Sequence, residues 1–119
     1  MTYSEALKYV NIDEGLKRVL NKPALYARLL KMFLLNEQHE QLKNSINKKE
    51  IQVSAEQAHA LKGITGNLSL TPLFNVTVKL MEQLRAGELN NETFNEYLLL
   101  YDKTVEAVNV VIEELSKQG

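Results

Sequence analysis

The stretch of sequence that decides the fold is residues 58–68, AHALKGITGNL. An α-helix turns about 100° per residue, so residues three and four apart lie on the same side. Small or apolar residues gather on one side of this helix, with Ile64 at its border: Ala58, Leu61, Thr65 and Leu68. We expect this side to face the core of a helical protein.

The opposite side of the same helix carries His59, Lys62, Gly63 and Gly66 within an arc of about 100°. A glycine inside a helix costs roughly 1 kcal/mol relative to alanine, so two glycines here do not stabilise the isolated fold. A helix surface without Cβ atoms lets a bulky group or another backbone come close. The glycines therefore indicate access to His59.

His59 and Lys62 supply complementary chemistry on this surface. An exposed imidazole is largely neutral at neutral pH, and its ring nitrogen can attack phosphorus and hold a phosphoryl group through a labile P–N bond. Lys62 follows at i+3, where side chains are neighbours, so its ammonium can reach phosphoryl oxygens. An exposed histidine or lysine alone is usually an ordinary surface residue, but both glycines on the same arc favour a site.

Glycine and proline are scarce, with five and two residues in a chain of 119, which favours helices over a turn-rich sheet. The expected helices span about residues 4–9, 13–20, 23–48, 54–69, 72–86 and 92–117. A kink near Asn36 in the longest of them is left open. Each start after the first has a suitable residue, and Gly87 suits the end of the fifth helix. The starting residues are Asp13, Pro23, Ser54 with Gln57, Thr71 with Pro72, and Asn91.

The last four helices each carry one apolar stripe and have short connections. The long helix has Leu25, Leu29, Met32, Leu35, Leu42 and Ile46, and the last helix has Phe94, Tyr97, Tyr101, Val105, Val108, Ile112 and Leu115. His39 falls within the first stripe, so we expect it to be a partly buried packing residue. The pattern predicts an all-α, antiparallel up-down four-helix bundle over about residues 22–117, with the short N-terminal helices packed across one end. Residues 1–119 form one domain.

Composition excludes several classes of protein. The formal net charge of −1 argues against a nucleic-acid binder, which normally has a basic surface. The chain has no cysteine and no apolar run approaching the roughly 20 residues that span a bilayer. Residues 1–10 contain Glu5 and lack the basic-then-apolar pattern of a signal peptide, so we expect a cytoplasmic protein without membrane contact. We also expect a monomer.

The segment from His59 to Gly63 resembles the His-x-Leu-Lys-Gly core of the histidine-phosphotransfer (HPt) domains of multistep phosphorelays. Ala58 before it and residues 66–68 after it fit the same motif. Upstream, residues 13–16, 25–26 and 30–34 resemble the first segment and long helix of the family, so the resemblance covers nearly the whole chain. One departure is Ser69-Leu70, where many family members have a small Gly-Ala-type pair.

The resemblance implies a phosphocarrier. His59 would accept a phosphoryl group from the phosphoaspartate of a response-regulator receiver domain and pass it to another receiver. Lys62 would steady the group, and Gly63 and Gly66 would let the receiver approach. Mg²⁺ would be bound by the receiver and not by this chain, which needs no cofactor or metal of its own. The chain has no nucleotide-binding pattern, so we expect no kinase or other enzyme activity.

Three alternatives remain open. Glu56 and His59 match the Glu-x-x-His spacing of metal-carboxylate bundles, but such sites need a second motif, and Asn36 stands three residues before His39. An interaction-only bundle could dock a receiver or another partner without carrying phosphate. The chain could also be the phospho-accepting part of a larger kinase. Besides receiver domains, a hybrid sensor histidine kinase is a candidate partner.

Overall fold

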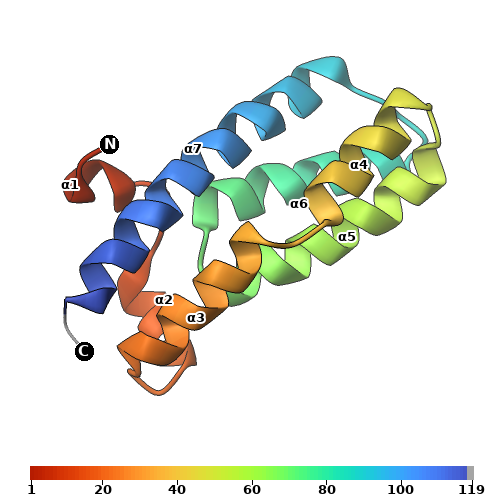
Figure 1. Ribbon diagram of the computed structural model, residues 1–119. Coiled ribbons are helices and arrows are strands. Elements are labelled where there is room, and N and C mark those ends of the chain that lie inside the picture. The colour runs from red at the N-terminus through yellow and green to blue at the C-terminus, as the bar shows by residue number, and fades with distance from the viewer. Residues whose placement is uncertain (118–119) are drawn as a thin grey trace.

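The computed structural model describes residues 1–117, and all the regular structure in that range is helical. The predicted all-α class is therefore confirmed. The helices, in chain order, are α1 (Tyr3–Ala6), α2 (Ile12–Arg18), α3 (Pro23–Leu34), α4 (Gln38–Asn47), α5 (Ile51–Asn67), α6 (Thr71–Arg85) and α7 (Asn91–Ser116) (Figure 1).

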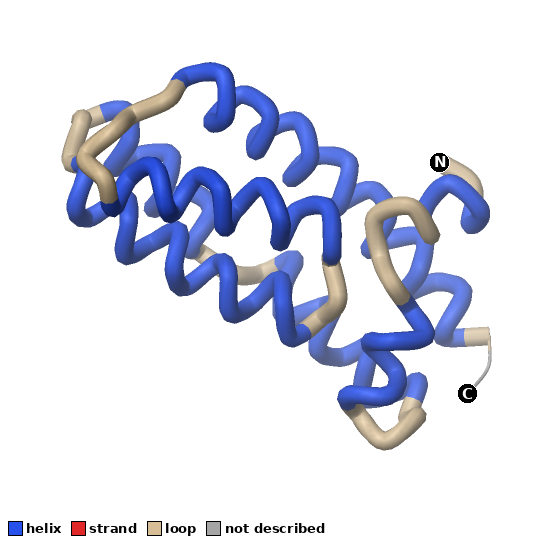
Figure 2. The backbone as a smooth tube through the Cα atoms, turned by 180° about the vertical axis from the view of Figure 1, so that it is seen from behind, coloured by secondary structure: helices blue, strands red, loops and turns tan. Residues whose placement is uncertain are grey.

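The molecule is elongated, with extents of 45 × 25 × 20 Å, and the helices from α3 to α7 form its bundle. Each of α4, α5 and α6 packs against the next helix in the chain, and α3 packs against α7. Figures 1 and 2 show α4 to α7 lying along one another and reversing direction at each short connection. Helix α1 packs against α7 and α2 against α3, so the N-terminal helices cover one end of the bundle (Figure 1).

Large apolar side chains from every long helix fill the core. The fully buried ones include Tyr26, Leu30 and Phe33 of α3, Leu42 of α4, Leu61 of α5, Leu73, Leu80 and Leu84 of α6, and Tyr97 and Val108 of α7. The predicted stripe of the last helix is confirmed in part, since Tyr97, Tyr101, Val108 and Leu115 are buried and the other three members are half-buried.

The stripe predicted for the long helix is confirmed at Leu42 and Ile46, which are buried, but it is wrong at Met32 and Leu35. Met32 and Leu35 are 60% and 81% exposed. In the first two turns the buried residues are Tyr26 and Leu30, each one position after a predicted stripe residue. Apolar residues occupy both of these faces of α3, so the spacing alone fits either one. Burial of the tyrosine and phenylalanine rings decides which face turns inward, because large aromatic side chains gain most from leaving water.

The long helix predicted for residues 23–48 is broken at Leu35–Glu37, which settles the question of a kink. Asn36 organises the break. Its side-chain amide donates to the carbonyl of Phe33 and to the hydroxyl of Tyr101, and its Oδ1 accepts from the backbone N–H of Gln38 at 2.9 Å. These bonds satisfy backbone groups at the end of α3 and the start of α4, where the helical pattern leaves them unpaired.

Two helices are capped by an asparagine that lies one or two positions before the predicted N-cap. Asn11 caps α2 in place of Asp13, with its Oδ1 accepting from the N–H of Glu14 at 3.3 Å. Asn90 caps α7 in place of Asn91, accepting from the N–H of Thr93 at 3.0 Å. In both cases an asparagine placed ahead of the predicted cap reaches the free N–H groups first.

The capping box predicted at Ser54 is wrong. Helix α5 begins at Ile51, and Ser54 is fully buried inside it. Its hydroxyl donates to the carbonyl of Glu50 at 2.8 Å and lies 2.7 Å from the hydroxyl of Ser45 on α4. The serine therefore joins two helices. The N-cap predicted at Thr71 is also wrong, because Thr71 is the first residue of α6, Leu70 holds the N-cap position, and Pro72 lies in the first turn. Gly87 follows the end of α6, as predicted, with φ of +82°.

Candidate functional site

Helix α5 separates a buried side from an exposed side as the sequence predicts. Its core side is buried throughout: Ala58, Leu61, Thr65 and the following Leu68. On the other side His59 and Gly63 are exposed, whereas Lys62 and Gly66 are half-buried. The structure thus brings all four predicted site residues to one surface of the bundle.

Arg85 is a fifth residue at this surface, and the sequence analysis missed it. It is the last residue of α6, and its Nη2 lies 3.2 Å from Nδ1 of His59. The three residues between α5 and α6 form a tight turn, so the beginning of α5 lies beside the end of α6 (Figure 1). The short connection is the one sequence signal that could have indicated Arg85, because it pairs early α5 residues with late α6 residues.

The contact between Arg85 and His59 constrains the imidazole. A guanidinium carries only donors and stays charged, so Nδ1 must accept this hydrogen bond. A neutral imidazole that accepts at Nδ1 carries its proton on Nε2. Nδ1 is therefore bound to Arg85, whereas Nε2 has no hydrogen-bond partner within residues 1–117 and belongs to an exposed side chain.

The two glycines differ in their surroundings. A Cβ atom placed on Gly63 would meet no atom of residues 1–117 within 4 Å, apart from its own helix and neighbours. A Cβ atom on Gly66 would lie 3.0 Å from Cε1 of Phe74 on α6. Gly63 therefore leaves open space beside His59, whereas Gly66 makes room for the ring of Phe74.

His59 lies between two depressions of the surface. On one side is a shallow groove of about 480 Å³, which His59 lines together with Lys62, Gly63, Phe74 and Arg18. On the other side is a smaller depression of about 290 Å³, lined by His59 with Gln52, Ala55, Glu56, Leu84 and Arg85. The imidazole is thus flanked by the cations of Lys62 and Arg85 from two different helices.

The N-terminal helix α2 completes the wall of the larger groove. Arg18 and Glu14 both line it, and their side chains form an exposed ion pair at 3.6 Å. Glu14 also accepts a hydrogen bond of 2.8 Å from the hydroxyl of Ser69, just after α5. The backbone N–H of Asn11 donates to the carbonyl of Ser69 at 2.9 Å, so α2 is tied to the end of the helix that carries His59.

A family model described as the Hpt domain matches residues 28–115 of the chain. The chain belongs to the Hpt domain family. The match begins inside α3 and ends near the end of α7, so it covers most of the bundle and includes His59, Lys62 and Arg85. No match was found among curated proteins or among solved structures. Hpt domains are phosphocarriers of His-Asp phosphorelays, and they interact with receiver domains and kinases.

This Hpt domain has Ser69-Leu70 where the sequence resemblance led us to expect a small Gly-Ala-type pair. Ser69 adopts a left-handed conformation with φ of +59°, which a glycine adopts at little cost. Its hydrogen bonds to Glu14 and Asn11 hold that conformation in place. Leu70 is fully buried, so the departure leaves the turn between α5 and α6 packed.

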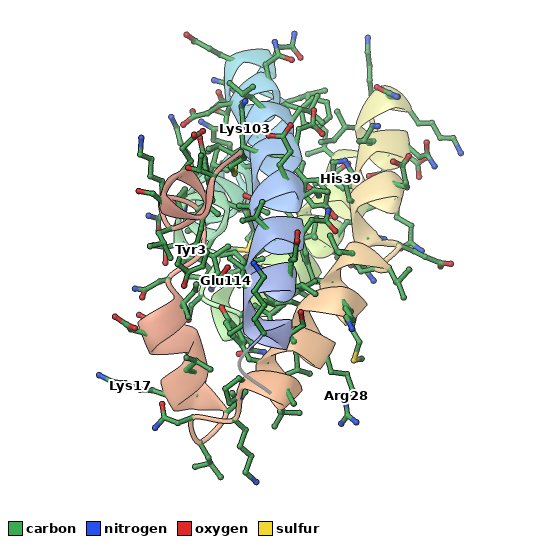
Figure 3. The ribbon with its side chains drawn as sticks, turned by 60° about the vertical axis from the view of Figure 1, so that its left-hand side comes forward. Tyr3, Lys17, Arg28, His39, Lys103 and Glu114 are labelled. Atoms are coloured by element: carbon green, nitrogen blue, oxygen red, sulfur yellow. The ribbon has the colours of Figure 1, made fainter. Side chains whose placement is uncertain are left out.

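His39, the other histidine of this Hpt domain, lies away from the predicted site residues. It is half-buried and lies on α4 beside α7 (Figure 3). Its Nδ1 is 2.8 Å from the hydroxyl of Tyr97, and its ring stacks on Tyr101 with centroids 3.6 Å apart. Burial, helped by the charge of Lys43, lowers the pKa of His39 below its usual value. These contacts agree with the packing role predicted for it.

The metal-carboxylate alternative gains no support from this Hpt domain. Residues 1–117 contain no group of three or more histidine, aspartate or glutamate side chains that could hold a metal ion. Glu56 and His59 share the smaller depression as a pair only. In the same part of the chain no helix is long and apolar enough to cross a membrane.

Proposed function

We propose that this Hpt domain accepts a phosphoryl group on His59 from the phosphoaspartate of one receiver domain and passes it to the aspartate of another. The observation that carries the proposal is the exposed imidazole of His59, flanked by Lys62 and by the open backbone of Gly63. The family match supports a phosphocarrier, and His59 is the histidine that the surface exposes. His39 is half-buried and packed against two tyrosines.

Each transfer is a substitution at phosphorus. The lone pair of Nε2 forms a P–N bond while the P–O bond to the donor aspartate breaks, and that electron pair returns to the carboxylate. Nε2 is the nitrogen for this step because Nδ1 is the one that faces Arg85. The proton that Nε2 carries in that contact first passes through solvent to Nδ1, which displaces the guanidinium, and Nδ1 releases this proton after the P–N bond has formed. The second transfer reverses these events with the aspartate of another receiver as nucleophile. We place Mg²⁺ in the acidic pocket of the receiver, where it neutralises the phosphoryl oxygens.

Lys62 stabilises the transferring group electrostatically. It lies one helical turn from His59 and lines the same groove, so its ammonium can approach the phosphoryl oxygens as a mobile point charge.

The receiver docks over His59 and the groove beside it. The aspartate of a receiver lies in a pocket, so its backbone must come close to α5 before the phosphorus atom reaches the imidazole. Gly63 permits this approach because no side chain occupies the space above it. A relay must release each partner, so we expect a modest, transient interface with a monomeric carrier.

The test is transfer of a labelled phosphoryl group from a phosphorylated receiver to the purified protein. The matched pair of variants is His59→Gln and His39→Gln, because these are the two histidines of the chain. We expect an acid-labile, base-stable label on the unmutated protein and on His39→Gln, and no label on His59→Gln. A label that persists on His59→Gln would overturn the proposal. A folded protein that no receiver labels would favour an interaction-only bundle.

A further inference from the structure

Arg85 makes the one side-chain hydrogen bond that His59 has within residues 1–117. The bond spans 3.2 Å from Nη2 to Nδ1 and joins the end of α6 to the exposed side of α5. Both side chains are exposed, so neither is held there by burial. The same contact can form when the ring carries a phosphoryl group on Nε2.

Only some states of the imidazole can accept this bond. An imidazolium carries N–H groups on both nitrogens, so its Nδ1 cannot accept from a guanidinium. A neutral ring accepts at Nδ1 if Nε2 carries either a proton or a phosphoryl group. A neutral phosphohistidine substituted on Nε2 therefore offers Arg85 the same acceptor as the unphosphorylated ring.

Protonation of Nδ1 decides how easily the P–N bond breaks. A protonated ring leaves phosphorus as a neutral imidazole, which is a much better leaving group than an imidazolate. Water then supplies the oxygen that binds phosphorus, the P–N electron pair returns to Nε2, and inorganic phosphate is released. Phosphohistidine is labile in acid for this reason.

We infer that Arg85 prolongs the lifetime of the phosphoryl group on His59 by donating to Nδ1 and keeping that nitrogen unprotonated. This inference rests on the proposed function. Arg85 acts on the ring through the nitrogen that does not react, so it is a positioning residue for the carrier. Its effect is distinct from that of Lys62, which we assign to the phosphoryl oxygens.

Loading of the ring requires Arg85 to move. Attack by Nε2 needs its lone pair, so the proton must first lie on Nδ1, where it excludes the guanidinium. Arg85 turns away while the P–N bond forms, and it returns once Nδ1 has released its proton to solvent. The exposed position of Arg85 at the last residue of α6 allows this motion.

Several other charged groups lie near the imidazole. Glu56 shares the smaller depression with it, and Lys62 lies in the larger groove. Glu14 and Arg18 of α2 line the groove as an ion pair and largely offset each other. Glu82 precedes Arg85 on α6 by three residues. Arg85 alone among these donates to Nδ1 in the described chain.

The test measures hydrolysis of the phosphorylated protein across a range of pH, after the phosphorylated receiver used to load it has been removed. Arg85→Met keeps an unbranched side chain without a donor, and Arg85→Lys keeps a cationic donor. We expect Arg85→Met to shorten the lifetime at neutral pH by about threefold to tenfold, and to move the onset of fast hydrolysis to higher pH. Arg85→Lys should restore part of both effects.

Three results would overturn the inference, and each has its own meaning. An unchanged lifetime and pH profile in Arg85→Met would show that the contact with Nδ1 has no effect. An equal acceleration at every pH would indicate that the guanidinium acts on the phosphoryl oxygens instead. A lack of label on His59 in the unmutated protein would reject the proposed function itself, and with it this inference.

Discussion

The hydroxyl of Tyr26 donates a hydrogen bond of 2.7 Å to the carbonyl of Leu68, joining α3 to the residue that follows α5. Tyr26 is fully buried, and burial raises the pKa of its hydroxyl, so the hydroxyl remains a donor at all ordinary pH values. Carbonyls at the end of a helix lack partners within it, and this bond supplies one. The helix that carries His59 is therefore anchored at its C-terminal end by a residue 42 positions earlier.

Replacing Tyr26 by phenylalanine should lower the free energy of unfolding by about 1–2 kcal/mol, because the carbonyl of Leu68 then stays buried without its donor. Denaturant unfolding of the two proteins measures the difference. Phosphotransfer by the folded variant should change little, since His59 lies more than two turns away along α5. An unchanged free energy of unfolding would show that the bond does not anchor the helix.

The same anchor depends on Gly15 of α2. A Cβ atom at this position would overlap the hydroxyl and Cζ of Tyr26. Gly15→Ala should therefore destabilise the fold by about 1–3 kcal/mol, the usual range for overpacking. Gly63→Ala is the matched control, because a Cβ atom there meets open space, and it should stabilise the helix by up to about 1 kcal/mol. Equal effects of the two substitutions in thermal or denaturant unfolding would contradict this account.

The arrangement of α5 was predictable, whereas that of α3 was not. On α5, apolar and polar residues separate cleanly at helical spacing, so Leu61 and His59 fall on opposite sides without ambiguity. On α3, apolar residues stand next to one another, as in Leu29-Leu30 and Met32-Phe33, so two different stripes fit the sequence. Only the packing of the whole bundle selects the one that contains Leu30 and Phe33.

Local sequence rules also left out contacts between distant segments. The Ser54–Gln57 spacing of a capping box is equally compatible with a buried serine that bonds to the preceding turn and to Ser45. Arg85 reaches His59 across 26 positions, and no motif marks it. The predicted site residues were found because they share one helix, and Arg85 was missed because it comes from the next.

Gly63→Gln tests the need for close approach of the receiver. The side chain projects into open space, so the free energy of unfolding should be nearly unchanged. Transfer from a phosphorylated receiver should fall by about tenfold to a hundredfold, because small displacements of reacting groups have effects of this size. Stopped-flow or quench measurements of the transfer rate provide the check. Transfer at the normal rate in the folded variant would show that the receiver does not approach over Gly63.

Lys62→Met tests the electrostatic role of the ammonium while keeping most of the side-chain stem. We expect transfer to slow by about tenfold, which is the loss of one charge-assisted contact, with unfolding unaffected. The difference in transfer rate between the two proteins should shrink as ionic strength rises, because Lys62 is only half-buried and salt screens its charge. Identical transfer kinetics in the two proteins would remove Lys62 from the mechanism.

His39 predicts a pH dependence of stability that is unrelated to phosphotransfer. Burial and Lys43 lower its pKa in the folded state, so the unfolded chain binds a proton more readily. The free energy of unfolding should therefore be unaffected by His39 above about pH 6.5. It should fall as the pH drops from there through the lowered pKa of His39. His39→Gln should reduce this fall when unfolding is compared at about pH 7.5 and about pH 5.5. An identical pH dependence in the variant would contradict the assignment.

The most direct test of the central claim is a relay rebuilt from three purified proteins: a labelled phosphorylated receiver, this Hpt domain, and a second, unphosphorylated receiver. The account predicts that label appears on the second receiver when the unmutated Hpt domain or His39→Gln is present, and that none appears with His59→Gln. Equal label on the second receiver with His59→Gln would contradict the claim that His59 carries the phosphoryl group between receivers.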